Sequence, residues 1–167
     1  MRLSGLKKLG AGVGLIGLAA VMAACSSGPK PAQTLILQAD TVVSSQGVKN
    51  PADICVQSSR FPIGGAVCWR VKVYDPATGQ PMDDKSVNSV VVSLKDGQTF
   101  TANYGGHPGQ PNAPKTDYFW TAAWPIPAGY PTGSVPYTVS AKSKDGRTGT
   151  FNQFNVAPSL LTVVAAQ

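Results

Sequence analysis

Short segments in which apolar and polar residues alternate make up most of the chain after residue 33. The clearest of them lies at residues 66–74. Four apolar residues fall on one face of this segment and four mostly polar residues on the other: Val67, Trp69, Val71 and Val73 against Cys68, Arg70, Lys72 and Tyr74. Because successive side chains of a strand point to opposite faces, this period of two predicts a half-buried strand in an antiparallel sheet.

The same pattern predicts further short strands along the chain. They are a first strand region at residues 34–38 and 41–44, and later strands at 90–94, 100–104, 117–124, 135–141, 148–156 and 160–164. Two Asp-Gly pairs, Asp96-Gly97 and Asp145-Gly146, separate neighbouring strands. Asp-Gly between two alternating segments predicts a tight hairpin turn.

Two irregular features are predicted within this strand pattern. Residues 103–115 are rich in Gly and Pro, which favours a long loop. Phe151 and Phe154 are out of phase within their strand, which predicts a β-bulge near Asn152.

The spacing of strands and turns predicts the fold class. Seven to nine short strands are expected, and no segment after residue 25 has a helical pattern. This arrangement resembles the immunoglobulin and fibronectin type III domains, which are antiparallel β-sandwiches. We therefore expect an all-β, immunoglobulin-like antiparallel β-sandwich over residues 34–167, preceded by a cleaved signal helix.

Composition supports a β protein with many turns. All eight acidic residues are Asp, a turn-former, and none is Glu, a helix-former. Gly and Pro add 32 residues, 18 and 14 respectively. The formal charge of +6 includes three cations in the first eight residues, which leaves 11 Lys and Arg against eight Asp, or +3, in the rest of the chain. With no Lys/Arg run, this small surplus argues against a nucleic-acid partner.

The first 25 residues have the character of an export signal. A basic head with Arg2, Lys7 and Lys8 precedes an uncharged run at residues 9–24. A charged head, an apolar middle and small residues before a cleavage site are typical of a secretory signal peptide. The run is shorter than the ~20 apolar residues that a bilayer span needs.

The end of this segment, Met22-Ala23-Ala24-Cys25, resembles the lipobox of bacterial lipoproteins. The resemblance implies that residues 1–24 are removed and that Cys25 is lipidated. Residues 25–33 then form the lipidated Cys and a flexible tether rich in Ser, Gly and Pro. The implied location is the cell envelope, and Ser26 after the Cys implies the periplasmic side of the outer membrane in a Gram-negative host. Ordinary secretion with an incidental free Cys25 is the alternative.

Cys55 and Cys68 remain as a pair once Cys25 is assigned to lipid. In an oxidising compartment such a pair predicts a structural disulfide. The 12 residues between them close a small loop, for which chain entropy gives about 3 kcal/mol of stabilisation. A redox dithiol and a metal site are the alternatives, but the spacing is not C-x-x-C and further metal ligands are not nearby in the sequence.

The sequence offers little catalytic chemistry. His107, the single histidine, has no carboxylate or nucleophile beside it in the sequence. Asp75, Asp83 and Asp84 could approach a Ca²⁺ ion, but their spacing fits no binding loop, and Asp is common in turns. We therefore expect no catalytic residues, no metal site and no cofactor.

A binding role is the function that these features favour. Trp120 is expected in the core, whereas Tyr104, His107, Trp124 and Tyr130 are the candidate binding-loop residues. Long loops on a rigid sandwich carry binding, and an exposed edge strand can accept a partner strand. We expect a membrane-anchored envelope lipoprotein that presents the loop at 103–117, or an edge strand, to a protein or glycan partner. The alternatives are a structural spacer in an envelope assembly and a non-catalytic subunit of an envelope enzyme.

Overall fold

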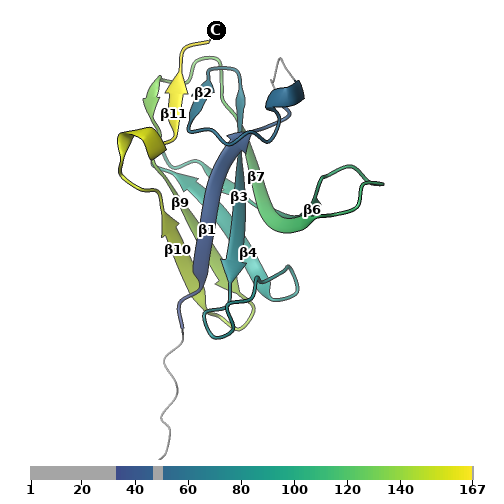
Figure 1. Ribbon diagram of the computed structural model, residues 1–167. Coiled ribbons are helices and arrows are strands. Elements are labelled where there is room, and N and C mark those ends of the chain that lie inside the picture. The colour runs from purple at the N-terminus through teal and green to yellow at the C-terminus, as the bar shows by residue number, and fades with distance from the viewer. Residues whose placement is uncertain (1–32, 47–50, 167) are drawn as a thin grey trace, which may run out of the picture. The chain divides into compact units, whose positions relative to one another are not determined.

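A computed structural model describes residues 33–46 and 51–166. The expected signal peptide, the lipidation site Cys25 and all of the expected tether except Gln33 lie outside the described residues. The described part consists of strands, turns and two single turns of 3₁₀ helix (Figure 1). The elements are β1 (Ile36–Val43), η1 (Pro51–Asp53), β2 (Arg60–Pro62), β3 (Ala66–Tyr74), β4 (Val87–Leu94), β5 (Thr99–Thr101), β6 (Asn103–His107), β7 (Asp117–Pro125), β8 (Gly133–Ser134), β9 (Tyr137–Ser143), β10 (Thr148–Asn152), η2 (Ala157–Ser159) and β11 (Thr162–Val164).

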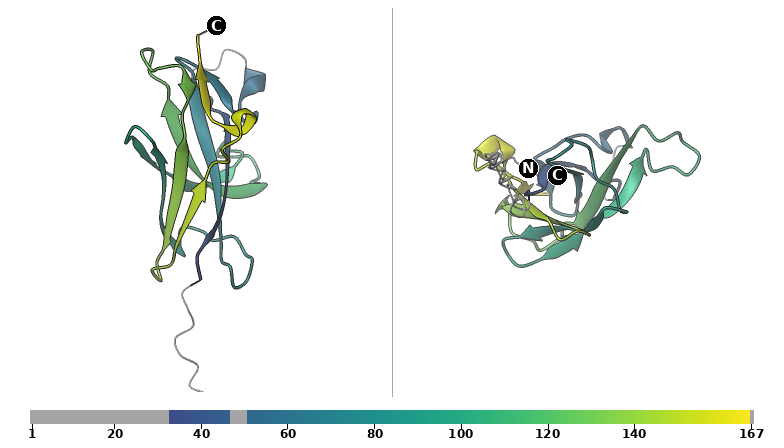
Figure 2. Two further views of the ribbon diagram at one scale, coloured as in Figure 1. Left: turned by 90° about the vertical axis from the view of Figure 1, so that its left-hand side faces the viewer. Right: turned by 90° about the horizontal axis from the view of Figure 1, so that it is seen from below.

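Eight of these strands form two antiparallel four-stranded sheets, which face each other (Figures 1 and 2). One sheet has the order β1-β3-β7-β6 and the other the order β10-β9-β4-β5. The eight strands can be lettered A, B, C, C′, D, E, F and G in chain order. The first sheet then has the order A-B-E-D and the second the order G-F-C-C′, as in immunoglobulin-type sandwiches. The prediction of an all-β sandwich is thus confirmed. A third, smaller sheet, β2-β11-β8, was not predicted, and its β2–β11 pair is parallel.

The strongest sequence pattern gave the most accurate element. β3 spans Ala66–Tyr74, the predicted range, and its buried and half-buried residues alternate as expected. Both Asp-Gly hairpins are also present. Gly97 has φ 94° and Gly146 has φ 88°, in the region where a residue with a Cβ is strained.

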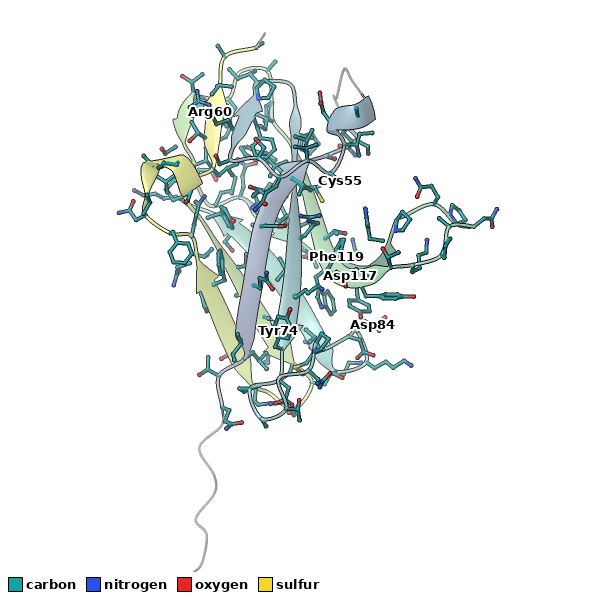
Figure 3. The ribbon with its side chains drawn as sticks, viewed as in Figure 1. Cys55, Arg60, Tyr74, Asp84, Asp117 and Phe119 are labelled. Carbon is teal, nitrogen blue, oxygen red and sulfur yellow. The ribbon has the colours of Figure 1, made fainter. Side chains whose placement is uncertain are left out.

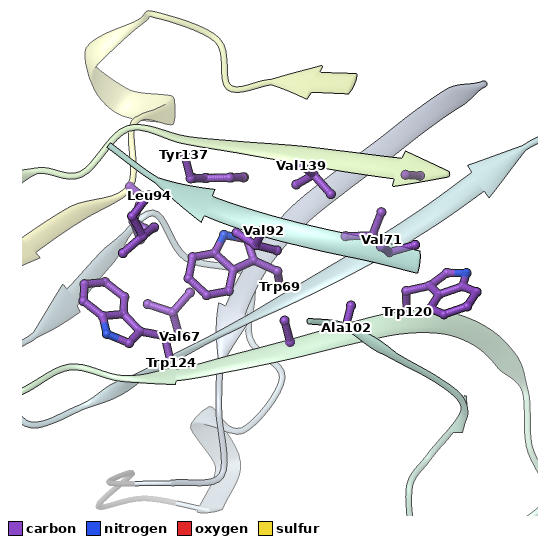
Figure 4. Packing of buried hydrophobic residues seen from close by; sticks show 14 of the residues in the cluster. Val67, Trp69, Val71, Val92, Leu94, Ala102, Trp120, Trp124, Tyr137 and Val139 are labelled. Atoms are coloured by element: carbon purple, nitrogen blue, oxygen red, sulfur yellow. The ribbon is translucent and has the colours of Figure 1, made fainter. Parts of the chain in front are cut away.

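The core lies between the two large sheets and is built around Trp69 (Figure 4). Its indole is fully buried and stacks on Phe100 and Trp124, with ring centroids 5.6 and 6.3 Å away. Tyr137, from the opposite sheet, meets the same indole edge-on at 5.6 Å. Aromatic pairs at these separations add to the hydrophobic stabilisation of burial. The core therefore joins β3 and β7 of one sheet to β5 and β9 of the other.

Two sequence predictions about irregular structure are wrong. There is no bulge near Asn152, because β10 pairs with β9 in unbroken register up to that residue and Phe154 lies beyond the strand. The irregularity falls instead in β4, between Val87 and Ser89. The first part of the expected loop at 103–115 is strand β6. A glycine at position 106 of this strand leaves room for the Lys115 side chain, because a Cβ there would lie 2.7 Å from it.

Candidate functional site

The four predicted binding residues do not converge on one patch. Tyr104 packs against Trp120 at one end of β7, with ring centroids 5.2 Å apart, and also stacks on Tyr118. Tyr130 packs edge-on against Trp124 near the other end of β7, at 4.8 Å. Trp124 is only 2% exposed, so its place among the candidate binding residues is wrong. Its inward direction follows from the period of two, because it is paired with the core residue Val67.

His107 is the last residue of β6 and is paired with Asp117 across the ladder to β7. Its ring lies against Phe119, with centroids 5.5 Å apart. The Asp117 carboxylate accepts hydrogen bonds from Lys72 Nζ, at 2.7 and 2.8 Å, and from the Tyr118 amide. The hydrogen bond from Lys72 holds the pKa of Asp117 below its ordinary value. Asp117 is thus committed to an ion pair, and no described carboxylate hydrogen-bonds the His107 ring.

The outer face of the β1-β3-β7-β6 sheet carries a small polar cleft of about 230 Å³. Two of its lining residues, Asp117 and Phe119, are labelled in Figure 3. Phe119 lines this cleft, and the centroid of its ring lies 5.8 Å from Cζ of the Arg70 guanidinium. Arg70 makes a two-pronged ion pair with Asp40, at 2.6 and 2.9 Å. The charged groups of the cleft therefore satisfy one another, and a ligand would have to compete with existing ion pairs.

The expected Cys55–Cys68 disulfide is not formed, and both residues are free thiols in the structure. β1 lies between their backbones. Cys68 pairs with Val42 on one edge of β1, whereas the Cys55 amide donates to the Val43 carbonyl on the other edge. Two strand spacings are about 9.5 Å, more than the ~7 Å between Cα atoms that a disulfide tolerates. The sequence spacing could not reveal the strand between them.

We predict slow alkylation of Cys68. The pKa of the Cys68 thiol is raised to about 11. Burial is the main cause, and the neighbouring Cys55 adds to it. Since only the thiolate reacts, iodoacetamide at pH 8 should modify Cys68 roughly a hundredfold more slowly in the folded protein than in urea. Peptide mass spectrometry of timed samples measures both rates. Equal rates in folded and unfolded protein would contradict the buried thiol.

Two of the three Asp residues considered for calcium, Asp75 and Asp83, have other partners. Asp75 forms an ion pair with Arg147 at 3.0 Å. Asp83 accepts hydrogen bonds from the Lys85 and Ser86 amides, which closes the turn before β4. In the described ranges, no group of three His, Cys, Asp or Glu residues is placed to hold a metal ion.

The feature that sequence reasoning did not locate is an unpaired strand edge on β1. The Leu35 amide donates to Thr148 of β10, and the Val43 amide donates to Val56, so both point away from β3. Alternate residues of a strand share this direction, and Leu37 and Ala39 therefore also direct their backbone groups away from β3. Within the described residues, no backbone group bonds to Leu37 or Ala39 on that outer edge.

β10 presents a second unpaired edge to the same gap. The Thr148 carbonyl points toward β1, where it accepts from Leu35, whereas the Arg147 carbonyl accepts from Ser143 of β9. The alternation directs the backbone groups of Thr150 and Asn152 toward β1 as well. The two strands meet at Leu35 and Thr148 and then diverge (Figure 1).

The gap between these edges, which we call the β1–β10 seam, is a groove of about 610 Å³. It is lined by residues 37–41 of β1, by residues 57–59, and by residues 151–159 in part. The opposite side of the sandwich differs, because the chain itself crosses there from β5 to β6. The Ala102 amide at this crossing donates to Val90 of β4. The two lateral sides are thus unequal, and the β1–β10 side is open between its ends.

No family model, curated protein or solved structure matches this chain. Its likeness to immunoglobulin-type sandwiches rests on strand order alone. Among the described residues, no helix has the length and apolar character required to cross a bilayer.

Proposed function

We propose that this protein is a lipid-anchored envelope lipoprotein whose sandwich domain is a non-catalytic binding module for a protein partner. The partner contributes an extended segment that adds to the unpaired edge of β1. The observation that carries this proposal is the pair of unbonded backbone positions, Leu37 and Ala39, at the open seam. Main-chain hydrogen bonds of this kind give affinity in strand-addition complexes.

The anchor is proposed from the sequence. Eight residues separate the lipobox-like Met22-Ala23-Ala24-Cys25 from Thr34, and β1 begins at Ile36. Residues 26–33, fully extended, reach at most about 28 Å. Anchoring at Cys25 would therefore keep the seam close to the membrane surface, within reach of membrane-bound partners.

Edge strands that stay unpaired are a hazard, because they template aggregation. Here the upper part of the β1 edge is occupied by the chain's own segment, through Val42–Gln57 bridging and the Ser58 amide bond to Thr41. The unpaired part is short and lies in a groove between β1 and β10. A short recessed edge favours specific capture of one segment over open-ended association.

A proline at position 39 tests the proposal. Pro lacks the amide hydrogen, and the Ala39 amide points away from β3, so Ala39→Pro should leave the β1–β3 ladder intact. We predict that this variant loses the partner. A photo-crosslinking amino acid at Phe154, a residue of the groove that is 72% exposed, reports contact in the producing cell.

Ala39→Ser is the matched control, since it keeps the amide hydrogen and a small side chain. Crosslinks should persist with Ala39→Ser and disappear with Ala39→Pro. A partner captured equally well by both variants would refute strand addition at β1, provided that circular dichroism shows both variants folded.

A further inference from the structure

The core-facing side of β7 continues past the end of the core. Trp124, Ala122 and Trp120 are buried on this side of the strand. Tyr118 is the next residue of the same series, because alternate residues of a strand share a face, yet its side chain is 49% exposed. The hairpin of β6 and β7 extends past the second sheet at this end (Figures 1 and 2). An aromatic side chain therefore lies on a sheet face that the rest of the domain leaves uncovered.

Three aromatic rings connect this face to the core. The Tyr104 ring centroid lies 5.2 Å from that of Trp120 and 6.0 Å from that of Tyr118. The planes of the two tyrosine rings are 24° apart. Tyr104 is half-buried and packs against the core cluster. The exposed Tyr118 ring is thus supported by a ring that the core itself holds in place.

The exposed end of the hairpin is also fixed by local contacts. Gly106 pairs with Tyr118 across the ladder, and a Cβ on this glycine would lie 3.0 Å from Tyr118 Cε1. The ring therefore rests against the backbone of β6. Lys115 Nζ donates to the carbonyls of Pro108 and Gln110, at 2.7 and 2.6 Å, which closes the loop between β6 and β7. A side chain that is already ordered loses little conformational freedom when a partner binds.

Carboxylates lie beside the aromatic rings. Trp120 Nε1 donates to the Met82 carbonyl at 3.4 Å, which brings the turn before β4 against the rings. Asp84 of this turn lies beside the β6–β7 hairpin in Figure 3. Burial raises the pKa of the Tyr104 hydroxyl, and the charges of Asp83 and Asp84 raise it further. Both carboxylates therefore act on the aromatic cluster.

The carboxylate of Asp84 is available to a partner. Within the described residues it forms no ion pair, and the neighbouring Lys85 forms none either. Lys72 is bound to Asp117, and Lys115 is bound to the carbonyls of its own loop. The positive groups around the rings are therefore either occupied or do not pair with Asp84.

An exposed tyrosine ring beside a free carboxylate is complementary to a guanidinium group. The face of an aromatic ring attracts a cation, and arginine forms this contact more often than lysine. The flat guanidinium can stack on the ring and still direct its N–H groups to a carboxylate. A lysine ammonium, as a compact and strongly hydrated charge, gains less from the ring.

From this arrangement we propose that the aromatic–acidic patch, formed by Tyr104, Tyr118 and Asp84, binds an arginine-bearing segment of a protein partner. The guanidinium lies on the exposed Tyr118 ring and pairs with the Asp84 carboxylate. β6 and β1 are the two opposite edges of their sheet, so this surface is separate from the unpaired edge of β1 and goes beyond the proposed function.

The test uses the full chain in micelles of an uncharged detergent and three short labelled peptides. The first carries arginine in a Gly-Ser background, the second citrulline in place of each arginine, and the third lysine. Fluorescence anisotropy gives the affinities. We expect the arginine peptide to bind about tenfold more tightly than the citrulline peptide, the combined effect of one exposed cation–π contact and one exposed ion pair. The lysine peptide should lie between them.

Three substitutions locate the binding site. Tyr118→Leu should weaken the arginine peptide about threefold to fivefold, whereas Tyr118→Phe keeps the ring and should bind it as the native chain does. Asp84→Asn should weaken it about threefold and reduce the salt dependence of binding. Asp53→Asn is the matched control, since Asp53 is also exposed and forms no ion pair in the described structure, and it should leave the affinity unchanged.

The outcomes separate this site from strand addition. Equal binding of the arginine and citrulline peptides, or unchanged binding by Tyr118→Leu or Asp84→Asn, would overturn the arginine site and leave the proposed function standing. The Ala39→Pro variant should bind the arginine peptide as the native chain does, even where it loses the partner at β1. Loss of the peptide in that variant, with the fold intact by circular dichroism, would overturn the separation of the two surfaces.

Discussion

Replacing Trp69 by Ala should lower the free energy of unfolding by about 3–5 kcal/mol, the range for removal of a large buried aromatic side chain. Trp69 has no exposed surface and touches rings from both sheets: Phe100, Trp124 and Tyr137. Its removal would leave a cavity that no neighbouring strand can fill without breaking its own ladder. Urea denaturation followed by circular dichroism measures the change.

Trp69→Phe keeps one aromatic ring at the same site. The Trp69 Nε1 has no hydrogen-bond partner within the described structure, so replacing it by carbon loses no hydrogen bond. We expect a loss smaller than that of Trp69→Ala, about 1–3 kcal/mol, because Phe keeps one ring but is smaller than Trp and leaves part of the cavity. Phe154→Ala is a control because the side chain is exposed, and it should change stability by less than about 0.5 kcal/mol. A loss below 1 kcal/mol for Trp69→Ala would contradict the aromatic core.

Gly149→Ala should destabilise the domain by about 2–3 kcal/mol, although it adds a single methyl group. Gly149 is a buried residue of β10, at the point where β1 crosses closest. A Cβ there would lie 2.4 Å from the Leu35 carbonyl oxygen and 2.6 Å from Leu37 Cδ1. The nearest atom belongs to the backbone of Leu35, so the chain just before β1 would have to move, and the hydrogen bond from the Leu35 amide to Thr148 would weaken.

Gly105→Ala is the matched control for this prediction. Gly105 is also a strand glycine, in β6, and a Cβ there would meet no atom within 4 Å. Its replacement should leave stability unchanged or raise it by up to about 1 kcal/mol, because Ala restricts the unfolded chain. Thermal or urea unfolding of the two variants side by side gives the comparison. Equal effects at both glycines would show that β1 does not approach β10 as closely as described.

Gly149 also influences the width of the β1–β10 seam. The contact between Leu35 and Thr148 closes one end of the groove, and the strands diverge from there. A variant that pushes β1 away from β10 would alter the width of the groove without touching Ala39. Gly149→Ala should therefore weaken capture of the partner as well as folding, whereas Gly105→Ala should leave capture of the partner unchanged.

Local sequence patterns predicted the strands well where one face is buried and the other is not. β3 matched residue for residue, because Val67, Trp69, Val71 and Val73 can only reach the core together. The pattern was less informative where it is short or lacks side chains. β6 contains Gly105 and Gly106, which have no side chains to alternate, and β8 has only two residues. Prediction therefore failed at those edges.

Candidate site residues were predicted less well than the strands. Tyr104, His107, Trp124 and Tyr130 were chosen as aromatic or titratable residues near loops, but the period of two already turns Trp124 inward. The groups that form the seam are backbone amides and carbonyls of Leu37, Ala39, Thr150 and Asn152. Every residue type except Pro carries both groups, so no residue in the sequence marks them.

The sequence by itself determined an all-β chain with a basic, apolar, lipobox-like start, hairpins at its Asp-Gly pairs and a core on one face of residues 66–74. These features are local, because strand period and turn chemistry depend on neighbours in the chain. Only the tertiary structure decided that β1 separates Cys55 from Cys68, that Leu35 meets Gly149, and that two unpaired edges face each other across one groove. Each of these depends on which distant strands pair and how far they diverge, which alternation along a single strand does not encode.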